Sequence, residues 1–108
     1  MRLPFTEFNV GERTYMLRLT ALSAARFEER TGMSVYKAVE CCDRVGVAAE
    51  LLYALIESVK PEFTKQETFA LIDEYIGEGG TLLSLNEVIA AALGNSGFFA
   101  KASPAPAT

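Results

Sequence analysis

The first part of the chain alternates apolar and polar positions in a way that predicts a β-hairpin. Tyr15, Leu17 and Leu19 occupy every second position, as expected for a strand with one buried face. The preceding segment 10–13, Val-Gly-Glu-Arg, is a turn signal, so two strands are expected between residues 3 and 19. Because two strands alone are marginally stable in water, this hairpin must pack on helices or pair with another chain.

Two short helices are expected next. Thr20 is a candidate N-cap for a helix over residues 21–30, and Gly32 can take the left-handed conformation just past its end. Ser34 can cap a second helix that reaches about Cys42, where the apolar spacing fits a helical face. The apolar residues expected to face the core are Leu22, Ala25 and Phe27 in the first helix, and Val35, Ala38, Val39 and Cys42 in the second.

The strongest helical pattern covers residues 47–60, after an interruption at residues 43–46. Its apolar arc is broad, which is typical of a central helix packed on more than one side. Pro61 is expected to end this helix, since proline cannot continue it and disfavours the helical conformation at the residue before it. The arc consists of Ala48, Leu51, Leu52, Leu55, Ile56 and Val59.

Two further helices complete the pattern. Residues 64–67, Thr-Lys-Gln-Glu, form a capping box, in which the Thr hydroxyl and the Glu carboxylate each accept from the other residue's amide. The helix that starts there should end at Gly77, with Gly79 and Gly80 as a flexible link, and a last helix over 82–93 should stop at the next glycine. The apolar residues along these helices are Phe69, Ile72 and Ile76, followed by the inward-facing Leu85, Val88, Ile89 and Ala92.

These elements predict an α+β fold, with an N-terminal β-hairpin followed by a bundle of about five α-helices. A chain of 108 residues is the size of one domain with a single core. We therefore expect one domain over residues 1–99. The composition then shifts to Ala, Ser, Pro and Thr, so residues 100–108 are expected to form a disordered tail.

Charge is divided unevenly along the chain, which has a net charge of -4. Residues 1–44 hold seven basic and six acidic side chains, whereas residues 45–108 hold three basic and eight acidic ones. The helical half should therefore present an acidic surface, which suits a basic or amphipathic partner. The same balance argues against a general nucleic-acid binder, because such proteins neutralise phosphates with Lys and Arg.

The sequence also bears on location. It has no apolar run near the roughly 18 residues that a membrane-spanning helix needs, and the first residues lack the apolar stretch of a secretory signal. A cytoplasmic protein without a membrane partner is expected. Cys41 and Cys42 are adjacent, so they cannot join distant segments, and reduced thiols are expected.

Residue types with catalytic or metal-binding chemistry are scarce. The chain contains no His, and His is both the commonest general base and the commonest transition-metal ligand. Adjacent carboxylates such as Asp73 and Glu74 point about 100° apart on a helix and are expected to be solvated. The Gly-rich segment 77–81 lacks the Lys of a phosphate-binding loop. We expect no enzyme activity, no cofactor, no metal and no small-molecule substrate.

Aromatic side chains are the candidates for partner binding. Phe98 and Phe99 follow the last predicted helix as neighbours, and only part of such a pair can face a core. They either fold back as a final piece of the core or anchor a partner. Tyr53 and Tyr75 are further candidates, because an amphipathic aromatic ring suits an interface.

The order and spacing of several strings resemble the tail assembly chaperones of long-tailed bacteriophages and prophages. The likeness spans residues 3–99, and no single string is diagnostic. The strings are 15–19 (Tyr-Met-Leu-Arg-Leu), 27–34 (Phe-Glu-Glu-Arg-Thr-Gly-Met-Ser), 51–55 (Leu-Leu-Tyr-Ala-Leu), 64–67 (Thr-Lys-Gln-Glu), 71–75 (Leu-Ile-Asp-Glu-Tyr) and 96–99 (Ser-Gly-Phe-Phe).

This resemblance implies a non-enzymatic protein that acts in the cytoplasm of the infected bacterium and is absent from the mature virion. Members of the family are thought to coat the tape measure protein, keep it soluble and bring tail tube protein subunits to it. An acidic, self-associating subunit with an apolar groove between helices would suit that role. Many members also exist as a longer, frameshifted product.

Two other functions fit the same sequence. One is a small structural head-tail joining or tail-completion protein that remains in the virion. The other is a regulatory or DNA-mimicking inhibitor that uses the acidic helical face. Presence in purified particles would favour the first, and binding that weakens steeply with salt would favour the second.

Overall fold

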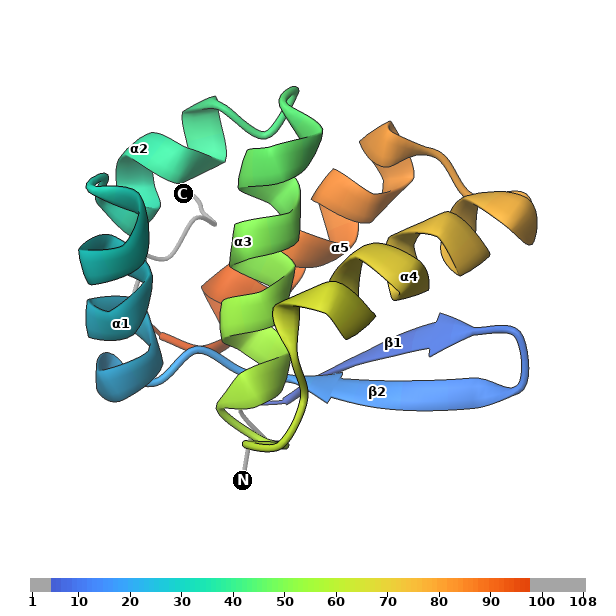
Figure 1. Cartoon of the computed structure of the whole chain (residues 1–108), viewed down its shortest axis with the longest axis horizontal. Coiled ribbons are helices and arrows are strands. Elements are labelled where there is room, and N and C mark those ends of the chain that lie inside the picture. The colour runs from blue at the N-terminus through green and yellow to red at the C-terminus, as the bar shows by residue number, and fades with distance from the viewer. Residues whose placement is uncertain (1–4, 98–108) are drawn as a thin grey trace, which may run out of the picture.

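The N-terminal hairpin is present as predicted. The structure, a computed structural model, describes residues 5–97. Strands β1 (Thr6–Val10) and β2 (Arg13–Leu17) pair antiparallel, with Val10 opposite Arg13 next to the loop (Figure 1). Gly11 opens this two-residue loop with φ +61°, a left-handed conformation that short hairpin loops require and glycine adopts readily.

Within residues 5–97 five helices follow the hairpin, so the predicted α+β architecture is confirmed. The tail predicted for residues 100–108 lies outside the described residues. Among the described residues, no helix combines the length and the apolar character needed to cross a bilayer. The helices are α1 (Ala21–Thr31), α2 (Val35–Glu40), α3 (Val45–Glu57), α4 (Lys65–Gly77) and α5 (Leu82–Asn95).

Side-chain caps fix where most of these helices begin. Thr20, Ser34, Thr64 and Thr81 each accept a hydrogen bond from the amide three residues later, which satisfies a donor that the helix itself leaves free. Three of these caps, all but Thr81, were predicted from the sequence. Gly32 ends α1 with φ +75°, as predicted.

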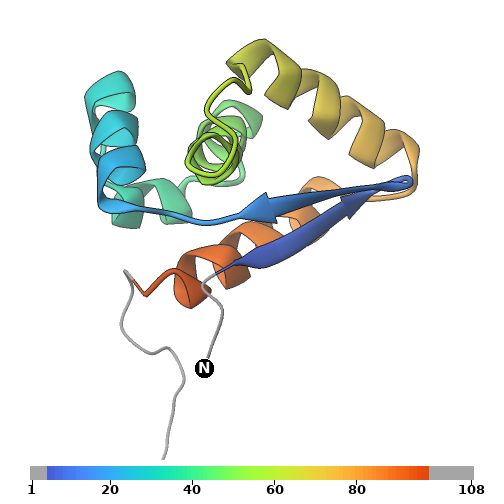
Figure 2. The same cartoon turned by 90° about the horizontal axis from the view of Figure 1, so that it is seen from below.

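Helix α3 lies at the centre of the molecule. In Figures 1 and 2, α1 and α2 lie on one side of it and α4 and most of the hairpin on the other, while α5 passes behind it in Figure 1. This confirms the central helix that the broad apolar arc predicted. Its buried residues are Ala48, Ala49, Leu51, Leu52, Ala54, Leu55, Ile56 and Glu57.

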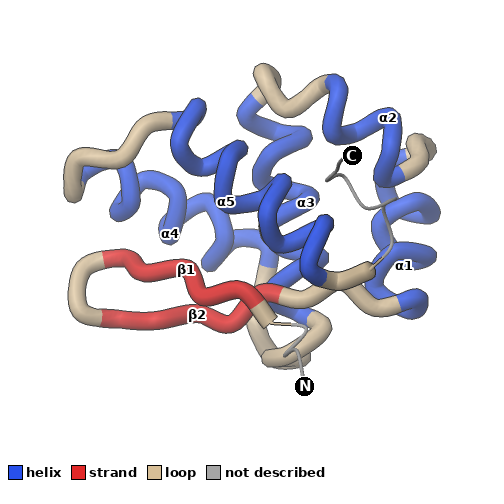
Figure 3. The backbone as a smooth tube through the Cα atoms, turned by 180° about the vertical axis from the view of Figure 1, so that it is seen from behind, coloured by secondary structure: helices blue, strands red, loops and turns tan. Residues whose placement is uncertain are grey.

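The hairpin is covered on its inner face by helices from the other end of the chain. Figures 2 and 3 show it beside α4 and α5. Phe8 packs on the ring of Tyr75 in α4, with 5.1 Å between ring centroids. Asn95, the last residue of α5, donates from Nδ2 to Thr6 Oγ1 over 2.7 Å. The hairpin therefore packs on the helices, one of the two arrangements that its marginal stability required.

Three core assignments made from the sequence are wrong. Leu22 is 61% exposed, and Ala25 is exposed as well. The capping box at Thr20 turns Ser23 inward, so the buried line of α1 runs through Ser23 and Phe27. Val59 is 39% exposed, because α3 ends at Glu57 and the helical stripe no longer applies beyond that residue.

The glycine pair after α4, expected from the sequence to form a flexible link, lies in a hydrogen-bonded turn. Gly80 donates its amide to the carbonyl of Tyr75 over 3.0 Å, and Gly79 has φ +106°. A Cβ atom on Gly80 would overlap the ring of Tyr75. A side chain larger than hydrogen therefore cannot fit here without moving that ring.

Candidate partner-binding surfaces

Tyr53 lies half-buried on α3, and the guanidinium of Arg30 covers its ring. The Arg30 Cζ atom is 4.8 Å from the ring centroid, within the range of a cation–π contact. Arg30 also donates from Nε to Glu50 Oε1 over 3.0 Å. Tyr53 is thus part of the joint between α1 and α3, and its role in partner binding stays a prediction.

Glu50 joins three helices through its two carboxylate oxygens. Oε1 accepts from Arg30 of α1, and Oε2 accepts from Lys65 Nζ of α4 over 2.6 Å. Burial by itself would raise the pKa of Glu50, but the hydrogen bonds and positive charges of Lys65 and Arg30 outweigh it and lower that pKa. The carboxylate is therefore held in its charged form at neutral pH.

Tyr75 connects α4, α5 and the hairpin. Its hydroxyl forms a 2.6 Å hydrogen bond with Ser84 Oγ of α5, while its ring contacts Phe8 and the backbone of Gly80. These contacts orient the ring within the fold. Its predicted role at an interface stays untested, as does that of Phe98 and Phe99, which lie outside the described residues.

An ion pair between a half-exposed guanidinium and a buried carboxylate links α1 to the end of α3. Glu57 is 5% exposed, and its Oε1 accepts from Arg26 Nη1 over 3.1 Å. Its second oxygen, Oε2, has no hydrogen-bond partner among the described residues. A buried carboxylate of this kind depends on its remaining partner, because an uncompensated buried charge is costly.

An apolar cleft lies between α2 and α5. It has a volume of about 250 Å³ and is lined by Val39, Cys42, Leu83, Asn86, Glu87, Ile89 and Ala90. Leu83 is 71% exposed at its rim, and Glu87 adds a negative charge. A cleft of this size can receive an apolar side chain from a partner helix.

Hydrogen bonding and burial define the floor of this cleft. Asn86 donates from Nδ2 to the carbonyl of Cys42 over 2.9 Å, which ties α5 to the end of α2. Burial, followed by the charges of Cys41 and Asp43, raises the pKa of the Cys42 thiol. This thiol stays protonated at neutral pH, so it acts as an apolar wall and not as a nucleophile.

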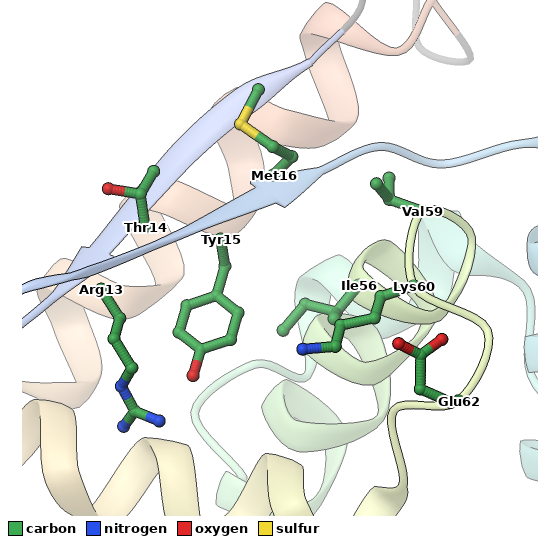
Figure 4. Close-up of a pocket in the computed structure, with 8 residues that line it drawn as sticks. All are labelled: Arg13, Thr14, Tyr15, Met16, Ile56, Val59, Lys60 and Glu62. Atoms are coloured by element: carbon green, nitrogen blue, oxygen red, sulfur yellow. The ribbon is translucent and has the colours of Figure 1, made fainter.

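A larger groove runs beside β2. It has a volume of about 540 Å³ and lies between the strand, the end of α3 and the segment that leads to α4. Figure 4 shows Arg13 and Tyr15 extending from β2 on the side where Ile56 and Lys60 lie. The complete lining is Arg13, Thr14, Tyr15, Met16, Ile56, Val59, Lys60 and Glu62.

Neither the cleft nor the groove was predicted from the sequence. One clue was present in the adjacent leucines 82 and 83, since neighbours on a helix point about 100° apart and cannot both face one core. The groove had no comparable clue, because it combines residues of β2 with residues more than forty positions later. In the described residues, no group of three His, Cys, Asp or Glu side chains is placed to hold a metal ion.

Comparison with known proteins adds no assignment: no protein-family model, no curated protein and no solved structure matches the chain.

Proposed function

We propose that this protein is a tail assembly chaperone of a long-tailed bacteriophage or prophage. In this role it binds the tape measure protein, helps recruit tail tube subunits and performs no catalysis. The order and spacing of sequence strings over residues 3–99 support the proposal. The order of elements in the described residues, a hairpin and then five helices, is the one that the apolar pattern predicted.

The apolar cleft between α2 and α5 is the structural observation that carries the proposal. A tape measure protein is long and largely helical, and an amphipathic helix binds by inserting apolar side chains into such a cleft. Leu83 at the rim and Ala90 in the wall offer apolar contact, and Glu87 offers a charge for a basic residue of the client. The acidic second half of the chain favours the same kind of client.

Co-expression with the tape measure protein encoded nearby tests this function. We expect a soluble, stoichiometric complex by pull-down and size-exclusion chromatography, with the tape measure protein insoluble when it is expressed alone. Leu83→Glu should abolish the complex, because it places a charge at the rim of an apolar site. Leu22→Glu is the matched control, since Leu22 is also a largely exposed helical leucine but lies on α1, and it should bind as wild type does.

Two results would contradict the proposal. The chaperone role would be ruled out if the tape measure protein is soluble when expressed alone and does not bind this chain in the pull-down. Detection of this chain in purified particles by mass spectrometry would favour the structural head-tail joining or tail-completion protein instead. Equal binding by Leu83→Glu and wild type would exclude the α2–α5 cleft as the client site.

A further inference from the structure

The outer edge of β2 presents backbone groups that β1 does not use. In an antiparallel pair, alternate residues exchange hydrogen bonds with the partner strand and the intervening ones point away from it. The pair Val10 and Arg13 closes a two-residue loop, so Arg13 and Tyr15 bond to β1. Thr14 and Met16 therefore direct their N–H and C=O groups outward, along the groove beside β2.

Helix α3 closes this edge at one end only. The amide of Arg18, the next outward-facing residue, donates to the carbonyl of Leu55 over 3.0 Å. Ser58 Oγ in turn donates to the carbonyl of Arg18. Within the part of the chain that the structure describes, no hydrogen bond from a helix or loop reaches the outward backbone groups of Thr14 and Met16. The outward backbone groups of β2 are thus hydrogen-bonded at Arg18 and have no partner among the described residues from Met16 to the hairpin loop.

The groove lies against this open stretch. Thr14 and Met16 belong to its lining on β2, and Ile56 and Val59 line it from the end of α3 and the segment that follows. In Figure 4 the side chains of Thr14 and Met16 extend from the face of β2 opposite to Arg13 and Tyr15. A smaller cavity of about 200 Å³ continues from it toward α4 and shares Tyr15 with it. An added strand lies only about 4.8 Å from the edge it pairs with, so the groove is placed where the side chains of such a strand would extend.

The charges of the groove indicate what kind of segment fits. The charged residues in its lining are Arg13, Lys60 and Glu62. Arg13 pairs with Glu74, whereas Lys60 has no ion pair with a described residue. A segment with a carboxylate would therefore find a complementary charge at Lys60. A second copy of this chain would bring its own Lys60 and Glu62 to the same edge, and the oligomeric state tests that alternative.

We propose that the β2 edge and its groove bind an extended, carboxylate-bearing segment of another protein by strand addition. The segment would pair with the outward backbone groups of Thr14 and Met16, place apolar side chains against Ile56 and Val59, and set an acidic side chain near Lys60. This is β-augmentation, in which backbone pairing supplies affinity and side-chain pockets supply specificity. The site is separate from the α2–α5 cleft and does not depend on the function proposed above.

The test uses the full chain and fluorescein-labelled eight-residue peptides that alternate valine with polar residues and carry one glutamate. Thr14→Pro removes the outward N–H of an edge position where proline is tolerated, whereas Thr14→Ala keeps it. We expect fluorescence anisotropy to show saturable binding by wild type, a loss of about tenfold or more in Thr14→Pro, and little change in Thr14→Ala. No binding of any peptide at millimolar concentration overturns the proposal.

A second measurement does not require a folded proline variant. Peptides N-methylated at every second residue, in the two alternative phases, are compared on wild-type protein. One phase should abolish binding, because it blocks the amides that face β2, and the other should preserve it. Equal binding of both phases would show that the peptide does not pair as a strand and would overturn the proposal.

Charge exchange tests the predicted contact at Lys60. Lys60→Glu should weaken binding of the glutamate peptide. It should strengthen binding of a matched peptide in which lysine replaces that glutamate. Leu83→Glu should leave peptide binding unchanged, which separates this site from the proposed chaperone function. If wild type is a dimer by analytical ultracentrifugation and Thr14→Pro is a monomer, a second copy occupies the edge and the proposal is wrong.

Discussion

Glu57 is the one charged side chain that is buried among the described residues, and it depends on Arg26. We expect Arg26→Met to lower the free energy of unfolding by about 1–3 kcal/mol, because the carboxylate then loses its hydrogen-bonding partner. Arg26 itself is half-exposed, so lost packing contributes little. Urea denaturation followed by circular dichroism measures the change.

A double-mutant cycle isolates this interaction. Replacing Glu57 with Leu removes the buried charge, so adding Arg26→Met in that background should cost almost nothing. An equal loss in both backgrounds would contradict the idea that Arg26 acts by pairing with Glu57.

The sequence predicts individual buried residues well where a helix packs on several sides and poorly where it packs on one. On α3, five of the six predicted arc residues are buried, because almost any orientation of a central helix buries its large apolar side chains. On α1 a small rotation decides the outcome. The cap at Thr20 turned Ser23 inward and left Leu22 exposed, a rotation that the apolar periodicity alone does not encode.

At the scale of elements, the turn between α4 and α5 depends on the absence of a side chain at Gly80. We expect Gly80→Ala to destabilise the protein by about 1–3 kcal/mol, since the new methyl group would overlap the Tyr75 ring. The ring cannot move without losing its contacts with Phe8 and Ser84. Thermal denaturation measures the effect.

Gly94→Ala is the matched control. Gly94 lies within α5, and a Cβ there meets no atom within 4 Å. This substitution should stabilise the protein by about 0.5–1 kcal/mol, because alanine favours the helix. Similar effects at both glycines would mean that the ring of Tyr75 does not restrict position 80.

Element boundaries were predictable where a side chain marks them. The Thr64 capping box predicts the observed start of α4, and Gly32 predicts the observed end of α1, from the sequence alone. Helix α3 lacks a side-chain cap at Arg44. The apolar pattern therefore predicted its start at residue 47, two residues after the observed start at Val45. Its end was placed at Lys60, whereas the helix stops at Glu57, where Ser58 bonds back to Leu55 and to Arg18 of the strand segment.

At the scale of the whole molecule, Glu50 makes the joint between α1, α3 and α4 sensitive to acid. The pKa of Glu50 lies below its ordinary value of 4.5, so the folded state binds this proton less readily than the unfolded chain. Its contribution to stability is therefore complete above about pH 5 and is lost as pH falls through the lowered pKa. We expect Glu50→Gln to cost about 1–2 kcal/mol at pH 7.

The difference between wild type and Glu50→Gln should shrink steadily below pH 4.5 in urea titrations. Glu40→Gln serves as the control, because the Lys37–Glu40 pair is exposed and should contribute little at any pH. A Glu50→Gln deficit that is independent of pH would show that the joint is not held by charge.

The candidate surfaces were the part that the sequence could not predict. Tyr53 and Tyr75 were identified as amphipathic aromatics, and the structure gives both of them intramolecular partners. The α2–α5 cleft and the β2 groove each combine residues from distant parts of the chain. Such surfaces arise from tertiary packing and have no local sequence pattern.

The hairpin leaves the ribosome before the helices and is among the last elements to be covered. Phe8 can form its ring contact only after Tyr75 of α4 has been made, and Thr6 can accept its hydrogen bond only after Asn95 at the end of α5 has been made. Throughout synthesis of the helices, both strands and their unpaired edges are therefore accessible to neighbouring nascent chains, the condition under which proteins misassemble. The hairpin is therefore open to misassembly until α4 and α5 have been made.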